Sequence, residues 1–127
     1  MAGRESEEEA PFVAHVRDLL HDWGPVGARR MFGGVGLYRG GVMFGLIFDD
    51  TLYFKVDDEN RADYEKEGMP PFLYDRQAKT VALSYYAVPP ALLDDGEALA
   101  SWAEKALAAA RRRAAPDRRR GRGRRLR

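Results

Sequence analysis

The chain contains no cysteine, and none of its apolar runs approaches the length of a membrane span. The first absence excludes a disulfide framework, thiolate catalysis and cysteine-based zinc sites, and it fits a reducing cytoplasm. The first ten residues include four glutamates, where a signal peptide would be basic and then apolar. We therefore expect a cytoplasmic protein with neither a leader nor a membrane contact.

Acidic residues are almost missing from the C-terminal end. Residues 111–127 hold ten arginines and one aspartate, a net charge of +9, whereas residues 1–110 hold eleven basic and nineteen acidic residues, a net charge of −8. The length of 127 residues and the 45% apolar content predict one domain. We expect an acidic, flexible N-terminus at 1–9, a folded domain at 10–113, and a disordered arginine-rich tail at 114–127 that has almost nothing to bury.

The apolar patterning predicts an α+β fold. A helical stripe begins near Ala10 and ends at Gly24-Pro25. Three apolar runs at 30–38, 42–48 and 52–56 follow, with connections too short for a parallel crossover, so they predict antiparallel strands. A short helix ending at Gly68, a hairpin of 72–74 with 80–86, and a last helix complete a two-layer α-β(3)-α-β(2)-α order with an antiparallel five-stranded sheet. Residues expected to share its core are Phe12, Leu19, Trp23, Phe54, Trp102 and Leu107.

The glycines of the first strand run resemble a phosphate-binding loop only superficially. Such a loop follows a strand and opens a helix. Here a strand-like segment follows, and Arg39 stands where the third glycine of G-x-G-x-x-G would fall. We therefore predict that Gly33, Gly34 and Gly36 serve backbone geometry, through positive φ or close packing, and that the chain binds no nucleotide or other cofactor.

No motif predicts catalysis or metal binding. His15 and His21 are six residues apart and cannot share a helix face, and Ser84 lacks the G-x-S-x-G elbow. The acidic cluster from Asp57 has Ala62 where an EF-hand needs glycine. We expect no catalytic, cofactor-binding or metal-ligating residues; an active site assembled across the fold, and hence an enzyme of unknown reaction, is an alternative. Two carboxylate pairs are expected at turns or helix starts: Asp49-Asp50 and Asp94-Asp95.

A sheet with helices on one side leaves a second face for a partner or for another copy of the chain. Tyrosine suits both a buried edge and an interface anchor. The candidate residues for such an interaction surface are Tyr38, Tyr53, Tyr85 and Tyr86.

Several fragments, taken in one order across residues 12–112, resemble the N-terminal domain of the TfoX/Sxy competence regulators. They are Met31-Phe32-Gly33-Gly34 with Gly36 and Tyr38, Met43-Phe44, Leu52-Tyr53-Phe54-Lys55-Val56, Pro71-Phe72-x-Tyr74, Ser84-Tyr85-Tyr86, and Trp102. The resemblance implies an α-β(3)-α-β(2)-α fold and a cytoplasmic bacterial regulatory protein, since full-length relatives promote transcription of competence genes alongside a DNA-binding activator. Those regulators carry a second, helical domain where this chain has its arginine tail.

The sequence thus favours a small non-enzymatic regulatory domain that contacts a protein partner such as the transcription machinery, with a homodimer as another use of the same face. The alternative is sequence-independent nucleic-acid binding, because arginine pairs with phosphate and releases counterions. The residues expected to make that contact are Arg118, Arg119, Arg120, Arg122, Arg124, Arg125 and Arg127.

Overall fold

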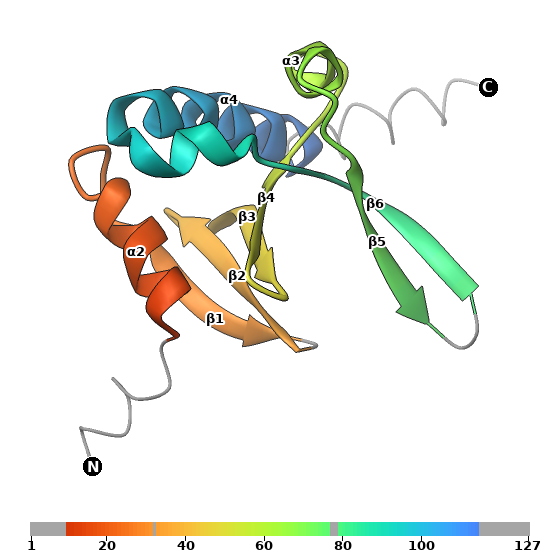
Figure 1. Ribbon diagram of the computed structural model, residues 1–127, viewed down its shortest axis with the longest axis horizontal. Coiled ribbons are helices and arrows are strands. Elements are labelled where there is room, and N and C mark those ends of the chain that lie inside the picture. The colour runs from red at the N-terminus through yellow and green to blue at the C-terminus, as the bar shows by residue number, and fades with distance from the viewer. Residues whose placement is uncertain (1–9, 32, 77–78, 115–127) are drawn as a thin grey trace.

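The computed structural model describes residues 10–31, 33–76 and 79–114. Its elements follow in the order α2 (Pro11–Leu19), β1 (Gly27–Met31), β2 (Gly34–Arg39), β3 (Val42–Phe48), β4 (Thr51–Lys55), α3 (Arg61–Lys66), β5 (Pro71–Arg76), β6 (Lys79–Ala87), a 3-10 helix η1 (Pro90–Asp94) and α4 (Gly96–Ala114) (Figure 1). The predicted acidic segment 1–9, Phe32, and residues 115–127 of the predicted tail lie outside the described residues.

All of these strands join one antiparallel sheet in the order β1-β2-β3-β4-β6-β5. The predicted α+β class and the antiparallel sheet are confirmed, but the sheet has six strands where five were expected. The run 30–38 is two strands, because the chain reverses at Gly33, where φ is +84°, and Met31 pairs with Gly34. A glycine with positive φ inside an apolar run therefore separates β1 from β2.

Two further hairpins have two-residue turns in which both residues have positive φ. Gly40 and Gly41 connect β2 to β3, with φ of +59° and +79°, and Asp49 and Asp50 connect β3 to β4, with φ of +54° and +55°. Turns of this kind match the right-handed twist of the strands that they join. The first carboxylate pair thus forms a turn, as its sequence predicted.

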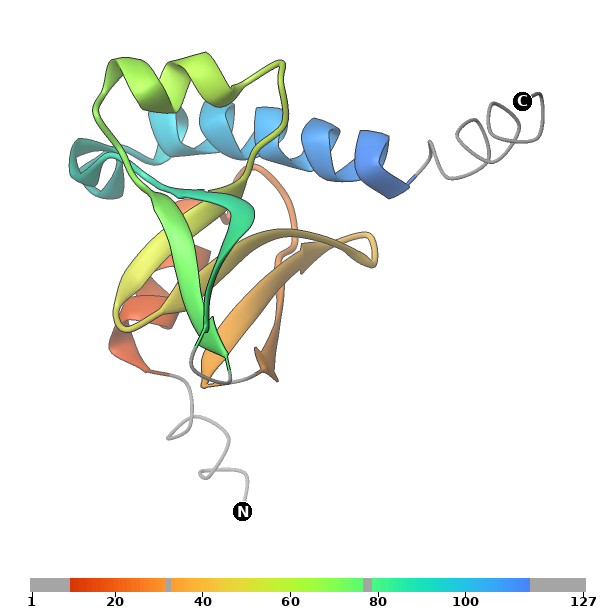
Figure 2. The ribbon, with the colours of Figure 1, turned by 90° about the vertical axis from the view of Figure 1, so that its right-hand side faces the viewer.

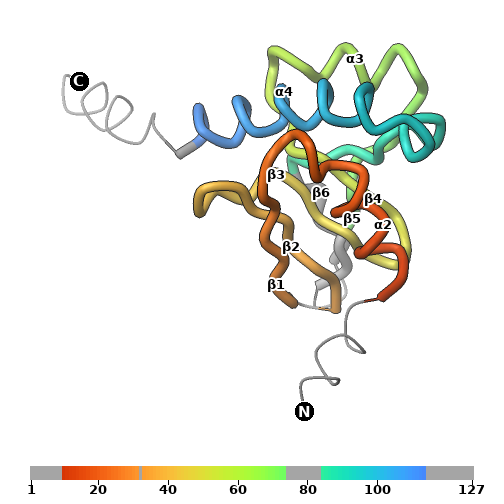
Figure 3. The backbone as a smooth tube through the Cα atoms, turned by 90° about the vertical axis from the view of Figure 1, so that its left-hand side faces the viewer, coloured from red at the N-terminus to blue at the C-terminus, as the bar shows by residue number. Residues whose placement is uncertain are grey.

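α4 and α2 lie on one face of the sheet, which is strongly twisted, and α3 lies above α4 in the views of Figures 2 and 3. α4 lies across β3 and β4, with Leu99 and Leu107 fully buried, and α2 contributes Val16 to the same core. α3 joins through Tyr64, whose ring lies 4.8 Å from that of Trp102. The core predicted from the sequence is confirmed: Phe54 and Leu107 are buried in it, and Phe12, Leu19, Trp23 and Trp102 pack against it.

Candidate interaction surface on the sheet

The face of the sheet turned away from the helices has its own small aromatic cluster. Partners across paired strands share a face, and Leu46 pairs with both Gly36 and Tyr53. The ring of Phe72, from β5, lies 4.8 Å from the ring of Tyr53 and 5.3 Å from that of Phe48. Leu46 and Phe72 are each 1% exposed. The sheet therefore buries apolar side chains on this helix-free face without a covering helix.

A row of cations and tyrosines lies on the same face. The guanidinium of Arg29 lies 5.3 Å from the centroid of the Tyr38 ring, and the ammonium of Lys55 lies 5.0 Å from that of Tyr85. Lys55 and Tyr85 also pair across β4 and β6. Burial, with the nearby Tyr38, raises the pKa of Tyr85 to about 12. We call Arg29, Tyr38, Tyr85 and Lys55 the basic–aromatic strip.

The structure brings three of the four candidate tyrosines to the helix-free face. Tyr38 and Tyr85 belong to the basic–aromatic strip, and Tyr53 packs against Phe72. Tyr86 pairs with the core residue Phe54 and therefore faces the helices. Its ring lies 5.9 Å from that of Tyr64 on α3. The interaction role of all four tyrosines stays a prediction.

Close packing against a neighbouring backbone requires Gly34 in β2, and Gly36 is closely surrounded by side chains. A Cβ at Gly34 would lie 2.6 Å from the carbonyl oxygen of Ile47, and a Cβ at Gly36 would lie 2.9 Å from the sulfur of Met31. Both distances are shorter than real Cβ contacts, so a side chain at either position would force its neighbours to move. Together with the positive φ of Gly33, this is the geometric role that the sequence predicted for these glycines.

Lys55 makes a short contact that the sequence did not predict. Its ammonium donates a hydrogen bond to the Ser84 hydroxyl at 2.5 Å, between residues 29 positions apart. Burial lowers the pKa of Lys55, and the positive charge of Arg113 lowers it further. A lysine beside a serine is one known arrangement of base and nucleophile. Ser84, however, is exposed on a strand, and its carbonyl accepts a sheet hydrogen bond from the Val56 amide at 3.0 Å.

The C-terminal end of α4 is held against the loop that follows β4. Arg112 donates two hydrogen bonds to the Asp57 carboxylate, at 2.6 and 2.9 Å, and also lies 3.9 Å from Glu59. The bond from Arg112 holds the pKa of Asp57 below its usual range. Both ends of this contact act on Lys55: the charge of Arg113, next to Arg112, lowers the pKa of Lys55, and the charge of Asp57 raises it. The predicted nucleic-acid-binding arginines, from Arg118 onward, lie outside the described residues.

Comparison with known proteins agrees with this architecture. The family model of the TfoX N-terminal domain matches residues 18–110, which include every strand of the sheet and most of α4. This chain belongs to that family. The resemblance inferred from the sequence is therefore confirmed. The chain is also 32% identical, over 83 residues, to the DNA transformation protein TfoX1 of Aliivibrio fischeri. That alignment covers 65% of this chain and 38% of the relative, so the chain spans less than half of the relative's length.

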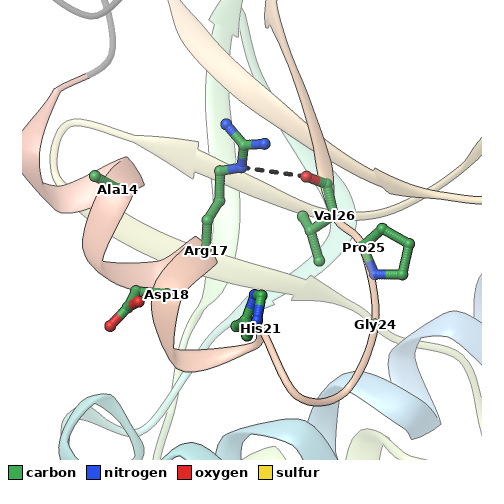
Figure 4. A pocket seen from close by; sticks show the side chains of 7 residues that line it. All are labelled: Ala14, Arg17, Asp18, His21, Gly24, Pro25 and Val26. Carbon is green, nitrogen blue, oxygen red and sulfur yellow. Dashed lines mark hydrogen bonds between the residues drawn. The ribbon is translucent and has the colours of Figure 1, made fainter.

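The histidines of this TfoX N-terminal domain lie apart. The His15 imidazole donates from Nε2 to the carbonyl oxygen of Leu93 at 2.9 Å. His21 lines a surface cavity of about 340 Å³ between α2 and the loop before β1 (Figure 4). There the Arg17 guanidinium donates to the carbonyl oxygen of Val26 at 3.1 Å and so joins the helix to the loop. Within the described ranges, no group of three or more histidines and carboxylates could hold a metal ion.

The second carboxylate pair lies at a helix start, as expected. The Asp95 carboxylate accepts a hydrogen bond from the Ala98 amide at 3.1 Å and so caps the first turn of α4. In the part of the chain that the structure describes, no helix is long and apolar enough to cross a bilayer.

Proposed function

We propose that this chain is a non-enzymatic regulatory domain of the competence type, which acts in the cytoplasm by binding a protein partner on the helix-free face of its sheet. The observation that carries the proposal is the pair of half-buried rings of Phe48 and Tyr53, which pack on the buried Phe72 beside the basic–aromatic strip. Aromatic residues and arginine are enriched at protein interfaces and supply most hot spots. The name of the Aliivibrio fischeri relative, a DNA transformation protein, supports the regulatory context.

The histidines and carboxylates that could serve as catalytic groups support a non-enzymatic role, because several of them already make structural hydrogen bonds or form turns. His15 bonds to η1, Asp49 and Asp50 form a turn, and Asp95 caps α4. The Lys55–Ser84 pair comes nearest to a catalytic arrangement. Acyl transfer also needs backbone amides aimed at an oxyanion, and the strand backbone beside Ser84 is engaged in the sheet.

A chimera tests the regulatory role. Residues 10–114 would replace the matching segment of the Aliivibrio fischeri relative, and the transformation frequency of the bacterium would be measured. We expect the chimera to restore transformation, and Tyr38→Ala in the chimera to reduce it. Leu93→Ala is the matched control, since Leu93 is also half-buried but packs on the helix side. A folded, expressed chimera that restores nothing would contradict a competence-type role.

Two measurements separate the other functions. If the Lys55–Ser84 pair were a catalytic dyad, a fluorophosphonate probe would label Ser84, and Lys55→Met would abolish that labelling. We expect no such Lys55-dependent labelling. Sedimentation of the full chain tests a homodimer: a dimer that Tyr38→Ala dissociates would assign the helix-free face to a second copy and not to a different protein.

A further inference from the structure

Three cations lie on the helix-free face and at the end of α4. Arg29 lies over Tyr38 and Lys55 lies over Tyr85, and the positive charge of Arg113 acts on Lys55. Among residues 10–31, 33–76 and 79–114, no carboxylate forms an ion pair with any of these three cations, although Asp57 interacts with Lys55 through its charge. The rings hold the first two cations in place, so an incoming anion would meet charges that are already positioned.

The nearest acids are already occupied. Asp57, two residues after the end of β4, accepts hydrogen bonds from Nε and Nη2 of Arg112, and Glu59 lies 3.9 Å from Nη1 of the same guanidinium. This pairing reduces their repulsion of an anion near Lys55. It also joins the last turn of α4, whose dark blue end projects beyond the connection from β4 to α3 (Figure 2), to the loop after β4 through the long side chain of Arg112. Seven more arginines follow Ala114 in the sequence.

We propose that the basic–aromatic strip and Arg113 bind single-stranded nucleic acid. Lys55 and Arg113 contact phosphates, and the half-buried rings of Tyr38 and Tyr85 lie against bases or sugars. Cations combined with aromatic rings are the composition that binds single strands, because every base has a face that can stack. An acidic peptide would satisfy the cations but offers no planar groups to the two tyrosines. The observations therefore favour nucleic acid.

This binding activity does not depend on the proposed protein contact, although it uses the same face. It also differs from a contact made by the tail alone. The tail contains arginines but no aromatic residue, so by itself it predicts no preference for single strands. A preference for single strands that depends on Lys55 and Arg113 would therefore assign the binding to the folded body.

Fluorescence anisotropy on the full chain tests the proposal. The probes are labelled oligothymidylate and oligouridylate of about 20 nucleotides, longer than the site sizes of about 4–16 nucleotides found for single-strand folds, with a duplex of equal length and polyglutamate for comparison. We expect either single strand to bind about tenfold more tightly than the duplex at the same salt concentration. The two single strands show whether DNA or RNA is preferred.

The deciding variant is Lys55→Gln/Arg113→Gln. It should weaken single-strand binding about tenfold and reduce the slope of log affinity against log salt by about 1.4, at ~0.7 per lost phosphate contact. The matched control is Arg30→Gln/Lys66→Gln, which removes the same charge from exposed positions elsewhere on the body. Lys55→Arg/Arg113→Lys keeps the charges and should keep the affinity, which separates lost contacts from a damaged fold.

Three results would overturn the proposal. In the first, both glutamine variants weaken binding equally, so that only net charge matters. In the second, duplex binds as tightly as single strands, which assigns binding to the arginine tail. In the third, polyglutamate binds more tightly than either nucleic acid, and its binding is lost in the Lys55→Gln/Arg113→Gln variant. This result would assign the face to an acidic protein.

Discussion

The guanidinium of Arg39 lies 4.2 Å from the centroid of the Trp23 ring. The adjacent Gly24 has a φ of +152°, which favours glycine, and a Cβ there would lie 2.8 Å from that guanidinium and displace it. The indole donates a hydrogen bond to the Glu104 carboxylate at 2.9 Å, and its ring meets Phe44 edge-on at 5.2 Å. One tryptophan thus joins the segment after α2 to β2, β3 and α4.

Arg39→Ala should lower the free energy of unfolding by about 1 kcal/mol, because it removes a cation–π contact at a half-exposed site. Urea unfolding followed by tryptophan fluorescence measures the change. Arg30→Ala is the control: Arg30 is exposed on β1 and should change stability little. Equal losses in the two variants would show that the contact with Trp23 does not stabilise the fold.

Gly34→Ala should destabilise the domain by about 1–3 kcal/mol, since a methyl group 2.6 Å from the Ile47 carbonyl forces β2 and β3 apart. Gly27→Ala is a matched glycine in the neighbouring strand, where the nearest atom to a Cβ is 4.0 Å away, and it should be tolerated. Thermal unfolding of both variants provides the comparison. A fully stable Gly34→Ala variant would refute the packing role.

The sequence predicted the features that depend on residues close together in the chain and missed those that depend on residues far apart. Helical periodicity located α2 and α4, and the short connections required antiparallel strands. The β1–β2 turn was missed because apolar residues continue through Gly33. The contact between Lys55 and Ser84 joins residues far apart in the sequence, and the nearness of Tyr38 to Tyr85 depends on the curvature of the sheet. Neither has a local signature.

Tyr64→Phe should leave the stability unchanged or raise it by about 1 kcal/mol. Tyr64 is 1% exposed, and within the described residues its hydroxyl has no hydrogen-bond partner. Burial accordingly raises the pKa of Tyr64 far above its usual value. The variant removes an unsatisfied polar atom but keeps the ring contacts with Tyr86 and Trp102. Urea unfolding tests this, and a loss of more than about 1 kcal/mol would mean that the hydroxyl has a partner.

Tyr85 should make the fold sensitive to alkali. Its pKa is raised from 10.0 to about 12 in the folded chain. Between these two pH values Tyr85 is protonated in the folded state but increasingly ionised in the unfolded state, so the free energy of unfolding falls as pH rises. Below pH 10 the hydroxyl is protonated in both states and the effect is absent. Tyr85→Phe should therefore make stability less dependent on pH between 10 and 12. Denaturation at a series of pH values measures this, and identical pH profiles would contradict it.

The Asp57–Arg112 pair should give the opposite pH dependence, at the acidic end. The Arg112 hydrogen bond lowers the pKa of Asp57 from 3.8, so its contribution is present above that value and is lost as pH falls. Arg112→Gln should cost about 1 kcal/mol at neutral pH, the upper range for a partly exposed but bidentate pair.

The cost of Arg112→Gln should shrink as pH falls below 3.8 and Asp57 becomes protonated in both proteins. Arg111→Gln removes the same charge from an exposed position on the same helix turn and should show neither effect. A cost that persists unchanged at low pH would mean that Arg112 stabilises α4 by packing and not through the carboxylate. High salt should reduce the difference only in part, because a bidentate bond is screened less than two separate charges.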